Sequence, residues 1–172
     1  MNKDKEIQKL LDKVKAVEKG EKLDLSSGED LSVAIMNLIS IEEHLFFSFG
    51  KAKKENYLEL LNQVREMRKE LLRHLVKDTE GEEWCLSKHL LAGSMRLMEV
   101  GTKALGKGDE KEAKEFFEMA YTLYELFWGL KLKLIKSTDL GETVEKSAKD
   151  NAHNFMAKLG EVIKKAIDCC RE

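Results

Sequence analysis

Proline is absent from this 172-residue sequence, and cysteine occurs only three times. Without proline, no residue forces a helix to kink or stop. Three cysteines, of which Cys169 and Cys170 are adjacent, do not provide a disulfide framework. We therefore expect a reducing compartment and a cytoplasmic location. The N-terminal stretch MNKDKEIQKLLDKVK is charged throughout, so we expect no signal peptide.

A large excess of either charge is also missing. Charged residues make up 36% of the chain, yet the formal net charge is only −2. This balance argues against binding to nucleic acid or to an anionic membrane surface. No window approaches the roughly 18 apolar residues that a membrane span needs, so we expect no membrane partner. A hydrophobic content of 42% is enough for a core, in one domain or two small ones.

Apolar residues recur with the period of a helix in six segments, and no segment shows the period-two alternation of a strand. The expected helices cover residues 2–19, 28–50, 55–77, 82–105, 110–136 and 141–170, and Asp109 is a candidate cap of the fifth. Because the loops are short, neighbouring helices should be antiparallel. We therefore predict an all-α fold: an antiparallel up-down helical bundle of four to five helices plus an N-terminal satellite helix.

The polar, turn-rich stretch GEKLDLSSGED separates the first predicted helix from the rest. This composition predicts an N-terminal amphipathic helix and the start of a linker over residues 1–22, followed by a helical bundle domain over 23–172. Within the bundle, residues 82–105 carry apolar and small side chains around roughly two-thirds of the circumference. We expect at least two neighbours to cover this helix. Its remaining polar strip is either a solvated face or a binding groove.

One predicted hairpin follows a known spacing of small and large residues. The pattern consists of Leu97, Val100-Gly101, Ala104, Gly108-Asp109, Ala113, Phe117 and Ala120. Residues 94–127 therefore resemble a single tetratricopeptide-like helical hairpin, although Leu97 replaces the usual Trp and the terminal Pro is missing. The resemblance implies close helix approach at the small residues and a peptide-binding concave face. It covers about a fifth of the chain, and no second copy of the repeat is visible.

Two charged residues interrupt the apolar stripes of the second and third predicted helices. Glu42 falls in the middle of the stripe of 28–50, and Arg68 lies inside that of 55–77. Antiparallel packing across the turn at 51–54 would bring them to similar depth, with Arg65 as a second partner for the carboxylate. A buried ion pair that fixes helix register is one interpretation. The other is an anion site in the core, with arginine as a bidentate donor.

A second cluster combines His74, Cys85 and His89. The cysteine and His89 lie four residues apart on one helical face, and His74 lies across the acidic turn from them. Together with Asp78, Glu82 or Glu83 they could supply three or four ligands for zinc or a similar metal. The alternative is that these are surface residues, because the spacing matches no dedicated metal motif.

These observations favour a non-enzymatic protein–protein interaction module without a cofactor, associating with itself or with another protein. The amphipathic first helix and its polar linker are the features behind this expectation. The alternative is a metal-binding protein or an enzyme that uses the polar strip around Cys85 and His89, with zinc as the metal. No catalytic triad, phosphate loop or dinucleotide-binding motif identifies a reaction.

Overall fold

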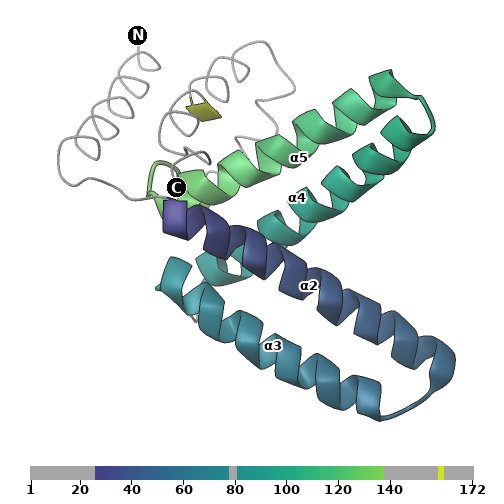
Figure 1. Cartoon of the computed structure of the whole chain (residues 1–172). Coiled ribbons are helices and arrows are strands. Elements are labelled where there is room, and N and C mark those ends of the chain that lie inside the picture. The colour runs from purple at the N-terminus through teal and green to yellow at the C-terminus, as the bar shows by residue number, and fades with distance from the viewer. Residues whose placement is uncertain (1–25, 78–80, 138–158, 161–172) are drawn as a thin grey trace, which may run out of the picture. The chain divides into compact units, whose positions relative to one another are not determined.

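The computed structural model of this chain describes residues 26–77, 81–137 and 159–160. These residues contain four long helices and no strand, so the all-α prediction is confirmed for the part of the chain described. The helices are α2 (Ser26–Ala52), α3 (Asn56–Leu75), α4 (Glu82–Gly106) and α5 (Glu110–Lys131) (Figure 1). The predicted helix 2–19, residues 20–25 of the predicted linker and all of the predicted helix 141–170 except 159–160 lie outside the described residues. Residues 26–30, which the sequence assigned to the linker, are helical and form the start of α2.

The chain divides into two compact units. One unit consists of residues 30–124 and therefore contains most of the four helices. The other combines residues 1–29 with residues 125–172. In this second unit, the end of α5 carries three buried residues, Phe127, Trp128 and Leu130. A Cβ built on Gly129 would lie 3.3 Å from Cδ2 of Leu159.

Helices α2 and α3 run side by side in opposite directions (Figure 1). Their connection is short, and its first residue, Lys53, adopts a positive φ of 53° while its amide donates to the Phe49 carbonyl at 2.8 Å. Ile35 of α2 and Leu72 of α3 are fully buried. The stripes that the sequence indicated therefore supply core residues on both helices.

Small residues allow α4 and α5 to approach closely. A Cβ placed on Gly101 would lie 2.7 Å from Cε1 of Phe117, and one on Gly93 would lie 2.9 Å from Cδ1 of Leu123. Ser94, buried on α4, donates its hydroxyl proton to the Ala120 carbonyl of α5 at 2.8 Å. The contacts at Gly101 and Ala120 are the close approach that the hairpin pattern of 94–127 implied.

The turn between α4 and α5 also follows the sequence pattern. Gly108 adopts a φ of 82°, which suits glycine because it has no Cβ. Asp109 accepts a hydrogen bond from the Glu112 amide at 2.9 Å, so it caps α5 as expected. Helix α4 contacts α5 through Ser94 and α2 through an ion pair of Arg96 with Glu43. Helix α4 therefore has two neighbours, but the α2 contact is made by its polar strip, and Met98 and Leu105 of its apolar arc stay exposed.

The prediction that the fifth helix extends to residue 136 is wrong, because α5 ends at Lys131. The chain turns back at Lys133, which has a φ of 56°, and the amides of Leu134 and Ile135 both donate to the Gly129 carbonyl. This turn brings Ile135 against Gly129, where a Cβ would lie 3.0 Å from Cδ1 of the isoleucine. The apolar residues beyond 131 are thus buried by reversal of the chain instead of by another helical turn.

Filling the close approach on α4 should destabilise the protein. In Gly101→Ala, the new methyl group would overlap the ring of Phe117 and approach the Ala113 carbonyl to 3.2 Å. We expect a loss of about 1–3 kcal/mol in the free energy of unfolding, measured by urea denaturation. Gly106→Ala is the matched control, because a Cβ there meets nothing within 4 Å. The control should be neutral or slightly stabilising, and an equal loss in both variants would contradict the packing argument.

Candidate functional site

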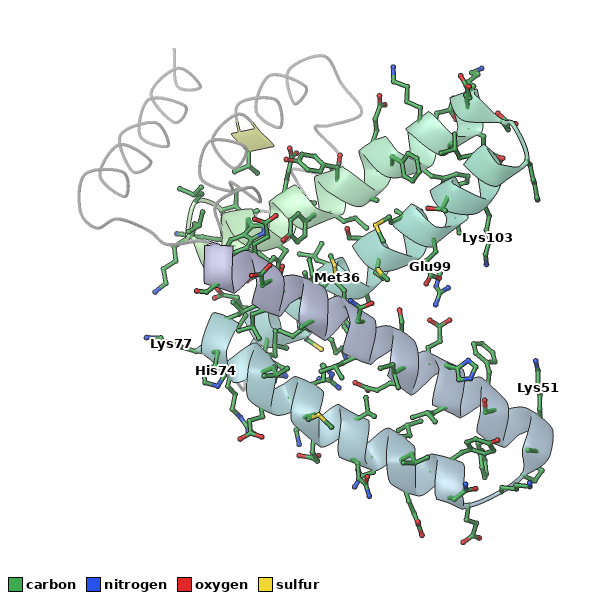
Figure 2. All side chains as sticks on the ribbon, viewed as in Figure 1. Met36, Lys51, His74, Lys77, Glu99 and Lys103 are labelled. Atoms are coloured by element: carbon green, nitrogen blue, oxygen red, sulfur yellow. The ribbon has the colours of Figure 1, made fainter. Side chains whose placement is uncertain are left out.

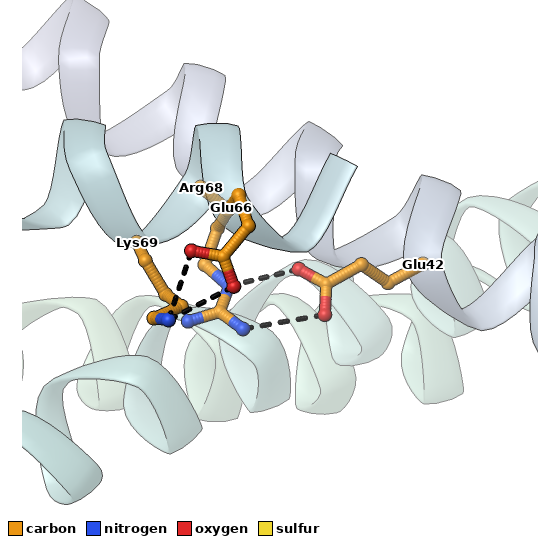
Figure 3. A network of polar contacts seen from close by, with 4 residues as sticks. All are labelled: Glu42, Glu66, Arg68 and Lys69. Atoms are coloured by element: carbon orange, nitrogen blue, oxygen red, sulfur yellow. Dashed lines mark hydrogen bonds and ion pairs between the residues drawn. The ribbon is translucent and has the colours of Figure 1, made fainter. Parts of the chain in front are cut away.

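The charged residues that interrupt the apolar stripes of α2 and α3 are in contact. Nε of Arg68 donates to Oε1 of Glu42 at 2.8 Å, and Nη2 donates to Oε2 at 3.3 Å (Figure 3). The arginine side chain is 5% exposed and the glutamate side chain 18%. The guanidinium thus meets both carboxylate oxygens in the two-point geometry that makes arginine–carboxylate pairs strong. This contact links α2 to α3 at one fixed register.

Arg65, the second partner considered for Glu42, is exposed and makes no hydrogen bond or ion pair with it in the described structure. On α3, Nζ of the neighbouring Lys69 lies 2.9 Å from Oε1 of Glu66, and both side chains are partly exposed (Figure 3). The hydrogen bond from Lys69 lowers the pKa of the Glu66 carboxyl, and the positive charge of Arg65 contributes less. Because Glu66 is exposed, this second pair contributes little to stability.

A second ion-pair network joins α2 to α4. Arg96 bridges two carboxylates, those of Glu43 on α2 and Glu99 on its own helix. All three side chains are about one-third to two-fifths exposed. Arg96 and Glu99 belong to the polar strip of 82–105, for which the sequence indicated no partner. The adjacent acidic residues Glu42 and Glu43 were the available signal, because two neighbouring positions on a helix point toward different partners.

Cys85 and His89 lie on one exposed face of α4, with Sγ 3.9 Å from Nε2. His74 is exposed at the C-terminal end of α3 (Figure 2), and no contact joins it to this pair in the described structure. Among the described residues, no three His, Cys, Asp or Glu side chains gather to hold a metal ion. Asp78 lies outside the described residues. The cysteine and His89 are two potential ligands, fewer than the four that a structural zinc site needs.

Large apolar side chains are exposed mainly on α2 and α3. Seven of the eleven in the described residues belong to these two helices. They are Val33, Ile41, Phe46 and Phe47 on α2, and Leu58, Leu60 and Met67 on α3. Phe46 and Phe47, the most exposed at 59% and 55%, contact each other edge to face. Exposed large apolar side chains are therefore more frequent on α2 and α3 than on α4 and α5, which carry the other four.

Helix α2 also has an unusual composition for a surface helix. Residues Ser27–Ala52 are long and apolar enough to cross a membrane by length and composition alone, so the expectation that no window approaches this limit is wrong. Core helices of soluble proteins also meet this criterion. Yet α2 exposes four large apolar side chains.

Comparisons with known protein families, with curated proteins and with solved structures each found no match.

Removing one member of the buried pair should cost more than removing both. Arg68→Met leaves the Glu42 carboxylate without its partner, and we expect a loss of about 3–5 kcal/mol in the free energy of unfolding. The double variant Glu42→Leu/Arg68→Met should recover much of this loss, because neither position then carries a charge. Denaturation of both single variants and the double variant measures the coupling.

The exposed pair provides the control for this cycle. Lys69→Met removes the partner of Glu66 at the surface and should cost much less than Arg68→Met, because water screens an exposed pair. Strictly additive losses in the Glu42 and Arg68 cycle, or a loss from Arg68→Met no larger than that of the control, would show that the pair does not determine the register of α2 and α3.

Proposed function

We propose that this chain is a non-enzymatic protein–protein interaction module that associates with a second copy of itself. The observation that carries the proposal is the concentration of exposed apolar side chains on α2 and α3. Exposed apolar residues scattered singly are normal on a monomer, whereas a group of them on adjacent helices lowers its free energy when a partner excludes water.

The remainder of the proposal concerns architecture and partner class. The helices would form an antiparallel up-down bundle, with residues 1–22 as a satellite arm attached through the polar linker. The partner is a protein because the net charge of −2 provides no general attraction to nucleic acid or to anionic membranes. The proposed protein has no cofactor. Its cytoplasmic location agrees with the low cysteine content, which is typical of a reducing compartment.

Self-association should be visible directly. We expect the full chain to change from monomer to dimer between about 1 and 100 µM, the range of weak to moderate protein interfaces, in sedimentation equilibrium. Because the driving force is burial of apolar surface, moderate salt should not dissociate the dimer. A chain that stays monomeric over this range would contradict self-association. Loss of the dimer on adding modest salt would point to a purely electrostatic contact.

A further inference from the structure

Helix α2 has an outer face that α3, α4 and α5 leave exposed. We define the α2 outer face as Val33, Asn37, Ser40, Ile41, His44 and Phe47, flanked by Asp30 and Lys51. Val33 and Ile41 are each 45% exposed, and Phe47 is 55% exposed. Positions 30, 33, 37, 40, 44, 47 and 51 alternate in steps of three and four, which is the spacing of a coiled-coil seam.

This face contains no Asp, Glu, Lys or Arg between its two flanking residues. The acidic residues of α2 in this interval, Glu42 and Glu43, are both engaged by arginines of neighbouring helices. In a chain with 36% charged residues, a solvated helix face of this length would normally carry several charges. The α2 outer face is therefore suited to be buried against a partner.

The flanking charges indicate which partner. Asp30 lies at the N-terminal end of the face, and Lys51 extends from the C-terminal end of α2 (Figure 2). If two copies of α2 lie antiparallel across a two-fold axis between Ser40 and Ile41, Asp30 of each copy faces Lys51 of the other. A parallel arrangement would place like charges together and align the helix dipoles unfavourably. The face is thus complementary to itself in the antiparallel orientation alone.

The interior of the face matches in the same register. Asn37 comes opposite His44 of the second copy, so two polar side chains able to hydrogen-bond meet each other. Val33 comes beside Phe47 of the second copy, so apolar side chains also meet. Ser40, next to the axis, is small enough for close approach of the two helices. A two-fold interface requires this pairing of residue with residue on a single patch.

We infer that α2 pairs antiparallel with α2 of a second copy through the α2 outer face. This inference rests on the proposed self-association and specifies its interface. Dimerisation covers Val33, Ile41 and Phe47 on both copies and forms two equivalent ion pairs at the ends of the seam. The asparagine and histidine of the seam fix the register, since a polar residue in such a position favours one alignment.

A charge swap tests the ends of the seam. Asp30→Lys and Lys51→Asp should each weaken dimerisation about tenfold, because two attractive contacts become repulsive in every dimer. The double variant should dimerise within about threefold of the unchanged protein. The melting temperature separates this effect from folding. The costs of two distant substitutions to stability should add, whereas their effects on dimerisation should cancel in the double variant. Matched controls are Glu110→Lys, in the first turn of α5, and Lys103→Asp, in the last turn of α4.

Cross-linking tests the orientation in the full chain with Cys85, Cys169 and Cys170 changed to Ser. A mixture of an Asn37→Cys chain and a His44→Cys chain should form a disulfide-linked heterodimer on oxidation. Either variant alone should remain unlinked, because identical positions are then about 10 Å apart along the axis. Met67→Cys, on α3, is the exposed-cysteine control and should also remain unlinked.

The outcomes separate this inference from the proposed function. A dimer that neither responds to the charge variants nor forms the heterodimeric disulfide uses another surface, which overturns the inference and leaves self-association intact. Self-linking of Asn37→Cys would instead show parallel pairing and overturn the orientation. A chain that is monomeric at all concentrations overturns both. If that monomer also sediments with vesicles of phosphatidylcholine and phosphatidylserine, the face belongs to a membrane surface.

Discussion

A guanidinium group can be buried only if a counter-charge and its hydrogen bonds are buried with it. Arg68 fulfils this condition through both oxygens of Glu42. The orientation of α2 relative to its neighbours depends on that contact. The pair determines which side of α2 faces α3. Glu43, one position further, then points toward α4 and meets Arg96. With both carboxylates directed toward neighbouring helices, the opposite side of α2 has no acidic residue between Asp30 and Lys51.

The two helix pairs are therefore held together by different physical means. Between α2 and α3, a directional ion pair selects one register at a cost in desolvation. Between α4 and α5, glycines at 93 and 101 let the backbones approach until leucine and phenylalanine side chains fill the remaining space. Dispersion and apolar burial dominate there, with one buried serine hydroxyl bonded across the pair. The ion pair determines the alignment of α2 with α3, and the two glycines determine how closely α4 and α5 approach.

Sequence periodicity predicted the fold class and the start of every described helix to within two residues. The apolar stripe of a helix is visible in the sequence whichever element covers it. It also predicted the contact of Glu42 with Arg68, since each is a lone charge in such a stripe. It did not predict the contact of Arg96 with Glu43, because a polar strip looks the same whether it meets water or another helix. The early end of α5 was missed for a related reason. No glycine or proline directly follows Lys131, since Lys133 takes the positive φ of the turn, and Ile135 is buried equally well by a reversed chain.

The apolar composition of α2 fits an interface with protein better than it fits a lipid bilayer. A bilayer would place Glu42 and Glu43 near the middle of the segment Ser27–Ala52, where each charged side chain costs about 2.5–3.5 kcal/mol. Arginine partners reduce that cost, but they belong to α3 and α4 and would have to enter the bilayer with α2. A protein partner on the opposite side of the helix requires no such transfer. The positions of the two carboxylates therefore favour a face that binds protein, with the ion pairs kept on the inner side and the apolar residues left for association.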